Sequence, residues 1–235
     1  AGKTTLMKVL FGLETPQTGK VYMDGKEVKI LNTLDAIEKG IGMVHQHFML
    51  IPSLTVAENV VLGVEPMKNG LFDFKKAVEM TEEVAKKYNF NIDPMARVSD
   101  LSVGQMQKIE IMKVLIKGAK IIIMDEPTAV LTPQETEELF EQLLLLKESG
   151  HTIIFISHKL NEVKALCNRM TILRDGKTMG TYEISDLDEH EISRLMVGRE
   201  VSLDIEKAEA DFGKTVFSVK DLVYADQFGK TRLDH

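Results

Sequence analysis

The sequence has one cysteine and no long apolar run, and these absences narrow what the chain can be. Because Cys167 is the single cysteine among 235 residues, no disulfide can form within the chain, which fits a reducing compartment. Cys167 lies on an apolar helical stripe, and we expect it to pack in the core. The longest apolar runs, such as residues 121–124, are far shorter than the roughly 20 residues that a membrane helix needs, and they suit buried strands.

An excess of basic residues is lacking as well. Asp and Glu number 36 against 29 Lys and Arg, which gives a formal net charge of −7. Proteins that bind the nucleic-acid backbone usually carry a basic domain or stripe, so the composition argues against a nucleic-acid partner. Any anion-binding site must therefore be formed by a small group of residues and not by an extended basic surface. With 44% apolar and 28% charged residues, the chain is an ordinary globular sequence that can bury a full core.

Short apolar runs alternate with helical spacings along most of the chain. A helix is expected from Gly2-Lys3-Thr4 to about Leu13. Further elements are expected as strand 40–45, helix 54–63, strand 120–125, helix 132–147, strand 152–157, helix 160–167 and strand 170–174. This rhythm predicts an α/β fold with a mostly parallel sheet. Asp-Gly pairs predict antiparallel hairpins at residues 20–29 and 170–183, and residues 64–118 are interpreted as a helical insertion.

The first residues match the end of a P-loop. Gly2, Lys3 and Thr4 precede a helix, and Ala1 and Thr5 flank them. In a P-loop, backbone N–H groups at a helix N-terminus hold phosphates while the lysine reaches the β- and γ-phosphate oxygens. Because a bare Gly-Lys-Thr before a helix also occurs by chance, the interpretation depends on motifs elsewhere in the chain.

Two adjacent carboxylates, Asp125 and Glu126, stand at the end of an apolar strand. Buried carboxylates are costly unless they bind something, and a Mg²⁺ ion fits that requirement. In P-loop hydrolases such an acid holds Mg²⁺ together with the P-loop hydroxyl, here Thr4, and a neighbouring acid orients or deprotonates water. Asp125 is therefore a candidate metal ligand and Glu126 a candidate base. Helix capping or a solvated turn is the alternative.

Two further polar sites have both a structural and a functional interpretation. Ser102 and Gln105 have the spacing of a capping box. With Gly104, they also offer a hydroxyl and free N–H groups at the positive end of a helix, which suits a terminal phosphate from another subunit. His158 follows the strand at 152–157, where a polar residue often marks the ligand-bearing edge of a parallel sheet. Alone, it could equally be a surface histidine.

With these motifs in this order, the sequence resembles the ATP-binding cassette of ABC transporters over about residues 1–198. The resemblance implies that Lys3 and Thr4 end the Walker A motif, residues 101–105 are the signature, and residues 121–126 form the Walker B strand. It makes Gln46 the Q-loop glutamine and His158 the switch histidine. The implied fold is a P-loop NTPase with a mostly parallel core sheet, antiparallel hairpins and a helical subdomain at about residues 64–118.

Three segments, residues 44–59, 129–132 and 196–201, resemble the double cassettes of ribose, galactoside and nucleoside importers. Residues 199–214 would then be a linker, and residues 215–235, strand-like over 215–223, the start of a second cassette. We expect both ends of the sequence to be cut. Two positions depart from the family: Val103 replaces a usual glycine, and Thr132 replaces a usual aspartate. Thr132-Pro133 with Glu135 is itself a strong helix start.

The implied activity is ATP hydrolysis that drives import of a sugar or nucleoside. ATP and Mg²⁺ are the implied cofactors, with Glu126, His158 and Gln46 in catalytic roles and Thr4, Gln46 and Asp125 at the metal. The implied partners are membrane-spanning permease subunits, a substrate-binding protein reached through the complex, and a facing cassette from the same chain or a second copy.

The implied location is peripheral, at the cytoplasmic face of the cell membrane. One alternative is a soluble ABC ATPase acting on DNA or ribosomes, which would need a long coiled-coil insertion or basic surfaces. The other is a nucleotide-binding regulatory module without turnover, against which Glu126 and His158 argue.

Overall fold

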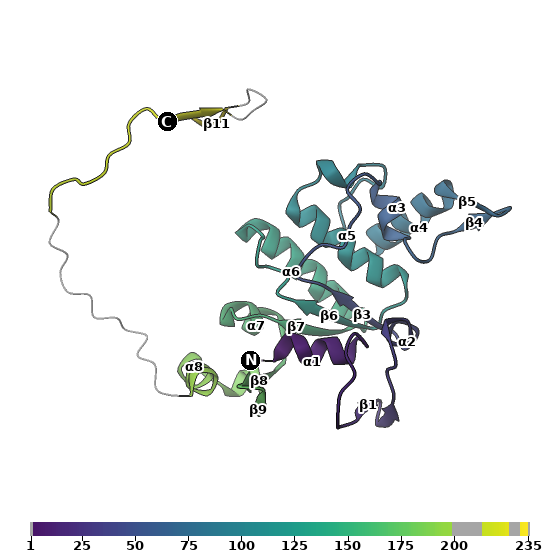
Figure 1. Ribbon diagram of the computed structural model, residues 1–235, viewed down its shortest axis with the longest axis horizontal. Helices are drawn as coiled ribbons and strands as arrows, with labels where there is room; N and C mark the ends of the chain where they lie inside the picture. The colour runs from purple at the N-terminus through teal and green to yellow at the C-terminus, as the bar shows by residue number, and fades with distance from the viewer. Residues whose placement is uncertain (1, 199–212, 226–230, 235) are drawn as a thin grey trace. The chain divides into compact units, whose positions relative to one another are not determined.

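Figure 1 shows the computed structural model, which describes residues 2–198, 213–225 and 231–234. The chain forms two compact units, Ala1–Glu200 and Val201–His235. Of the predicted linker, residues 199–212 lie outside the described part of the chain. The two units are treated separately below.

A three-stranded parallel sheet lies at the centre of the first unit (Figure 1). Its strands are β3 (Ile41–Val44), β6 (Ile121–Asp125) and β7 (Thr152–Ile156), in the order β3-β6-β7. All three were predicted from their apolar runs. Because both pairs are parallel, the carboxyl ends of the three strands meet at one edge of the sheet.

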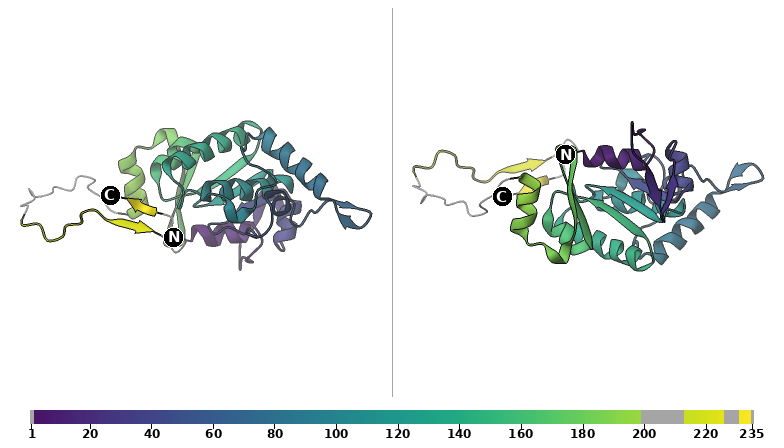
Figure 2. Two further views of the ribbon diagram at one scale, coloured as in Figure 1. Left: turned by 90° about the horizontal axis from the view of Figure 1, so that it is seen from above. Right: turned by 90° about the horizontal axis from the view of Figure 1, so that it is seen from below.

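Both faces of this sheet are buried, which explains why its strands are almost continuously apolar. Successive side chains point to opposite faces. Thus Ile123 and Ile156 pack with Met7 of α1 (Lys3–Leu10) on one face, and Ile122 and Met124 belong to the core cluster on the other. Figure 2 shows α1 and α6 on opposite sides of the strands.

The first unit also contains several helices. They are α2 (Thr33–Glu38), α3 (Val56–Val60), α4 (Phe74–Lys87), α5 (Val103–Ile116), α6 (Pro133–Glu148), α7 (Leu160–Leu166) and α8 (Glu189–Val197), with 3₁₀ turns at Val98–Asp100 and Ile184–Asp186. Complete capping boxes begin α3, α5 and α6, as their sequences predict. Sequence analysis did not predict α2 and α8. Cys167 packs against the larger core cluster, as expected.

Antiparallel hairpins flank the sheet. The predicted pairs are β1 (Val21–Met23) with β2 (Lys26–Val28), and β8 (Arg169–Arg174) with β9 (Lys177–Glu183). A third pair, β4 (Met67–Lys68) with β5 (Leu71–Phe72), interrupts the insertion that was expected to be mainly helical. Asn69 and Gly70 have φ values of 53° and 82°, the left-handed conformations that a tight hairpin turn requires. This hairpin projects from the first unit in Figures 1 and 2.

In the second unit the predicted strand at residues 215–223 is wrong over nearly all its length. The strand β10 spans Val223–Ala225 and pairs with β11 (Thr231–Asp234). Residues 215–222 form no strand. Alternation of apolar residues produces a strand only where a neighbour completes the hydrogen-bond ladder, and β11 pairs with no residue before Val223. Val216, for example, is 98% exposed.

The predicted fold class is confirmed: an α/β fold with a parallel core sheet, antiparallel hairpins and a helical subdomain. Within the described ranges, no helix combines the length and apolarity needed to cross a membrane.

Candidate functional site

The N-terminus of α1 presents uncapped backbone groups. Gly2 precedes the helix at φ 84°, no described side chain caps it, and the first turn carries no acidic residue. The first N–H groups of a helix lack partners within the helix and form its positive end, so this terminus suits an anion. Lys3 is half-buried, whereas Thr4 and Thr5 are exposed. Ala1, also predicted to bind phosphate, lies outside the described residues.

Two of the three predicted catalytic residues contact each other at the carboxyl edge of the sheet. Glu126 directly follows β6, and His158 is the second residue after β7. The Nδ1 atom of His158 lies 3.3 Å from Oε1 of Glu126. The N–H of Glu126 also donates to the carbonyl of Ile156, at 3.0 Å. Gln46 follows β3 at the same edge, but it is exposed and no described hydrogen bond joins it to either residue.

Asp125 and Glu126 are adjacent but lie in different environments. Asp125 is only 5% exposed, and no hydrogen bond or ion pair among the described residues reaches its carboxylate. Burying a carboxylate without a partner is costly, and a bound cation would offset that cost. The Glu126 side chain is 28% exposed, and its φ of 49° lies in a region that non-glycine residues occupy rarely, often at functional sites.

A buried carboxylate that sequence analysis missed supports the two loops. Glu162 accepts hydrogen bonds from the hydroxyls of Thr128 and Ser157 and forms an ion pair with Lys159 at 2.9 Å. Burial raises the pKa of Glu162, but the hydrogen bonds from Lys159, Thr128 and Ser157 outweigh it and hold the pKa below its ordinary value. The loop that carries Glu126 and the loop that carries His158 are therefore joined through the Glu162 carboxylate.

The segment after Gln46 is tied to the middle of α5. The N–H of Met49 donates to the buried carboxylate of Glu110, and the ammonium of Lys113 donates to the carbonyl of Met49 at 2.6 Å. Glu110 and Lys113 also form an ion pair at 3.3 Å. The position of this segment is therefore coupled to that of α5.

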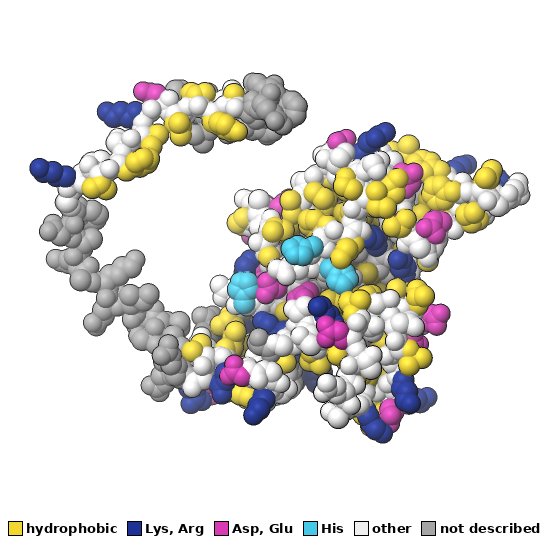
Figure 3. All heavy atoms as spheres, in the orientation of Figure 1, with side chains coloured by type: hydrophobic (Ala, Val, Ile, Leu, Met, Phe, Trp, Pro, Cys, Tyr) yellow, Lys and Arg dark blue, Asp and Glu magenta, His cyan; other side chains and the backbone are white. Residues whose placement is uncertain are grey.

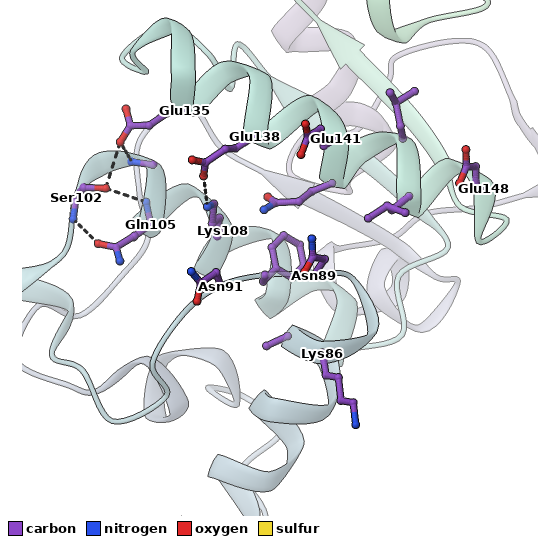
Figure 4. A pocket seen from close by; sticks show the side chains of 16 residues that line it. Lys86, Asn89, Asn91, Ser102, Gln105, Lys108, Glu135, Glu138, Glu141 and Glu148 are labelled. Atoms are coloured by element: carbon purple, nitrogen blue, oxygen red, sulfur yellow. Dashed lines mark hydrogen bonds and ion pairs between the residues drawn. The ribbon is translucent and has the colours of Figure 1, made fainter.

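The predicted signature residues form the first turn of α5 (Figure 4). The Ser102 hydroxyl accepts from the N–H of Gln105 at 3.3 Å, and the Gln105 side chain accepts from the N–H of Ser102 at 3.0 Å. This is the capping box that the sequence predicts. Gly104 is buried. Among the described residues, no hydrogen bond or ion pair joins this turn to Lys3, Thr4, Asp125 or Glu126.

A carboxylate from another helix completes this turn. Oε1 of Glu135, on α6, accepts from the Ser102 hydroxyl at 3.2 Å and from the N–H of Gly104 at 3.1 Å. Its Oε2 accepts from the N–H and the hydroxyl of Thr132, at 3.0 and 3.1 Å. Sequence analysis recognised Glu135 only as part of the start of α6. The contacts with Ser102 and Gly104 lie at one end of a groove of about 1080 Å³ lined by residues of α4, α5 and α6 (Figure 4).

Histidine and acidic side chains lie close together in the middle of the face drawn in Figure 3. Within the described ranges, however, no group of three or more His, Cys, Asp or Glu side chains could hold a metal ion on its own.

The amino-acid sequence is similar to those of import ATP-binding proteins. The nucleoside import ATP-binding protein NupA of Lactococcus lactis subsp. cremoris is 44% identical over 233 residues, which cover 99% of this chain and 46% of that protein. The guanosine import ATP-binding protein NupO of Bacillus subtilis is 45% identical over 229 residues, covering 97% of this chain and 45% of that protein. The chain thus spans about half the length of the curated relatives it matches.

Solved structures show the same architecture. An ATP-binding cassette of an ABC transporter in its ADP conformation is 25% identical, with a TM-score of 0.69, covering 83% of this chain and 80% of that one. A cassette in a dimeric post-hydrolysis state bound to ADP and Pi is 27% identical, with a TM-score of 0.64 over 78% of this chain and 81% of that one. The family model described as ABC transporter matches residues 1–129, more than half of the sequence. The resemblance is therefore confirmed, and the chain belongs to the ABC transporter family.

Proposed function

We propose that this chain binds and hydrolyses ATP and that the full-length protein uses this reaction to power import of a nucleoside or sugar. The contact between Glu126 and His158, next to the unpartnered carboxylate of Asp125, is the observation that carries the proposal. The names of the similar import ATP-binding proteins support the direction of transport and the substrate class.

The residues present fit a Mg²⁺–ATP complex. Lys3 and the N–H groups at the start of α1, with residues 1–5 around them, would hold the phosphates. The oxygens of Asp125, Thr4 and Gln46 are the ligand type that Mg²⁺ prefers, and this ion commonly uses one or two carboxylates plus substrate phosphates. When bound, Mg²⁺ supplies positive charge to the phosphate oxygens.

Glu126 is the proposed general base. It orients the attacking water and accepts its proton, while His158 holds the Glu126 carboxylate and contacts the γ-phosphate side. The carboxylate is partly exposed, so water reaches it, and the Glu162 network fixes the two loops that carry the pair. Gln46, which follows β3 at the same edge of the sheet, would supply a further oxygen ligand to the metal and help to position the water.

The proposed site is completed by a facing cassette, either the second half of the same protein or a second copy. Ser102, Gly104 and Gln105 would bind the terminal phosphate of the nucleotide held by that cassette. The lack of any described bond between this turn and Lys3 or Asp125 is consistent with this arrangement, as is the dimeric state of a similar solved cassette. We further propose that residues 1–198 form one cassette and residues 215–235 begin another.

Transport requires partners beyond this chain. We place the protein at the cytoplasmic face of the membrane, attached peripherally to permease subunits and, through them, to a substrate-binding protein. Gln46 and residues 48–59 would contact the permease. ATP drives motion because it favours the closed pair of cassettes over the open one.

Replacing Glu126 with Gln in the full-length protein tests the hydrolytic role. ATP binding should persist, while the rate of phosphate release should fall by about a hundredfold or more, the usual contribution of a positioned base. Glu137→Gln, the same change at an exposed position of α6, is the matched control. Normal turnover by the Glu126 variant would exclude this residue as the base. Absence of turnover in the unmodified protein would favour the regulatory alternative.

A further inference from the structure

A single carboxylate connects the signature turn of α5 with the start of α6. Oε1 of Glu135 accepts from a hydroxyl and a backbone N–H of the signature turn (Figure 4). Its Oε2 accepts from Thr132. The donors on Oε1 are Ser102 and Gly104, at the positive end of a 14-residue helix. A phosphate oxygen from a facing nucleotide would use these same two donors.

We propose that Glu135 competes with the terminal phosphate of the facing nucleotide for Ser102 and Gly104, and must leave them before the nucleotide is enclosed. The inference rests on the proposed function, because it takes the signature turn as the phosphate site. It adds a residue to that site: Glu135 is a positioning residue that sets how much ATP is needed for closure.

The geometry leaves no room for both anions. Oε1 of Glu135 already accepts from the N–H of Gly104 at 3.1 Å, and a Cβ added at Gly104 would lie only 2.6 Å from the same oxygen, so the carboxylate occupies the space next to this backbone. A phosphate at the same place would overlap with it and would also be repelled by its negative charge. Occupation by Glu135 and occupation by the nucleotide are therefore mutually exclusive.

The two oxygens of Glu135 have separate roles, so the carboxylate can release one partner and keep the other. Oε2 and the N–H of Glu135 form the capping box with Thr132, which stabilises the first turn of α6 without help from Oε1. Thr132 ends the loop that begins at Glu126. Release of Ser102 and Gly104 is thereby linked to the loop that carries the proposed base.

Glu135→Gln in the full-length protein separates competition from simple anchoring. A glutamine keeps the cap on Thr132, just as Gln105 caps Ser102 at α5. The amide NH₂ of the glutamine then faces the N–H of Gly104. Because both groups are donors, they cannot form a hydrogen bond, and the negative charge is also lost. Because hydrogen bonds to a charged group are the stronger ones, we expect the KM for ATP to fall by about threefold or more and to change by a larger factor than kcat, while Tm is unchanged or slightly lower.

The matched control is Glu138→Gln. Glu138 lies one turn further along α6 and lines the same groove, but it pairs with Lys108 at 2.6 Å and touches neither Ser102 nor Gly104. This variant loses the same charge and should leave KM unchanged. Equal KM values for the two variants would overturn the proposal, as would a Glu135→Gln protein with a raised KM and a lowered Tm, which would make Glu135 a structural anchor only.

Thr132→Ala isolates the cap. This variant weakens the start of α6 but leaves the Glu135 carboxylate on the signature turn, so the KM for ATP should not fall. If KM falls as much as in Glu135→Gln, loss of the cap on α6 explains the change in KM, and the proposal is wrong. The proposed function fails by a different result, namely turnover that survives Glu126→Gln. The two failures are therefore distinguishable.

Discussion

The hydroxyl of Thr128 lies within hydrogen-bond distance of both carboxylate oxygens of Glu162, at 2.8 and 2.7 Å. Thr128 belongs to the loop after β6 and Glu162 to the first turn of α7, so this contact joins the segments that carry Glu126 and His158. Glu162 thus supports the two loops that carry the proposed catalytic pair without itself belonging to that pair.

Replacing Glu162 with Gln should lower both stability and turnover. A buried carboxylate with hydrogen bonds from charged and neutral donors is replaced by an amide that cannot accept from all of them, and we expect a loss of about 2 kcal/mol in the free energy of unfolding. Because the loops lose their alignment, kcat should fall more than KM changes. Urea unfolding and steady-state kinetics measure the two effects. Glu137→Gln is again the exposed control; similar results for both variants would exclude the supporting role.

The same residue makes an acid-side prediction. The pKa of Glu162 is held below its ordinary value of 4.5, so its contribution to stability is fully present above that pH and is lost as the pH falls through the folded-state pKa. The difference in unfolding free energy between the unmodified protein and Glu162→Gln should therefore be constant from pH 8 to about pH 5 and shrink below that. A difference that grows on acidification would contradict the assignment.

His45 makes a prediction nearer to neutrality. Burial lowers its pKa from the ordinary 6.5, although Glu110 and Asp125 act in the opposite direction; Lys113 and Lys8 lower it further. Below pH 6.5 the unfolded chain binds a proton that the folded chain refuses, so stability should decline as the pH falls from about 7 to 5. Denaturant unfolding at several pH values measures this slope.

His45→Asn should reduce the slope, and His47→Asn, at the exposed neighbour, should not. An unchanged slope in the His45 variant would show that other groups cause the pH dependence.

Asp125→Asn should separate stability from activity. The carboxylate is buried without a described partner, so neutralising it should raise stability by about 1 kcal/mol, or about 2–4 °C in Tm for a chain of this size. Magnesium-dependent ATP turnover should be lost, because the proposed ligand is gone. Thermal unfolding and phosphate release test this, with Glu148→Gln on α6 as control. Loss of stability in the Asn variant would show that Asp125 has a structural role.

Gly104→Ala should strongly reduce turnover without unfolding the protein. The new Cβ would meet the flexible end of Glu135 at 2.6 Å and can push it away, while alanine favours the helix by up to about 1 kcal/mol. The methyl group would, however, occupy the proposed phosphate position. We expect a Tm that is unchanged or higher, together with a loss of phosphate release of about tenfold or more. Full activity would show that the phosphate does not approach this backbone.

Sequence patterns predicted the parts of the fold that rest on local rules. The buried strands follow from apolar runs such as residues 121–124, and the capping boxes at Ser102 and Thr132 follow from spacing alone. The β4–β5 hairpin was missed although Asn69-Gly70 marks its turn, because helical apolar spacing on the C-terminal side dominated the interpretation of that segment.

The supporting carboxylates could not be predicted in the same way. Glu162 lies 34 residues from Thr128, and Glu135 lies 31 residues from Gly104. Each is an ordinary acid in the first turn of a helix, where the sequence has a sufficient local explanation. Their second partners come from chain segments brought near by the fold, and a contact of this kind leaves no periodic or spacing signal.

In the assembly proposed above, the helix α5 connects the signature turn with the segment that follows Gln46. Ser102 caps its start, and Glu110, eight residues later and about 12 Å along the axis, binds the Met49 backbone. In that assembly, a displacement that a facing nucleotide imposes on the first turn of α5 would be transmitted along the helix to the segment that we propose contacts the permease.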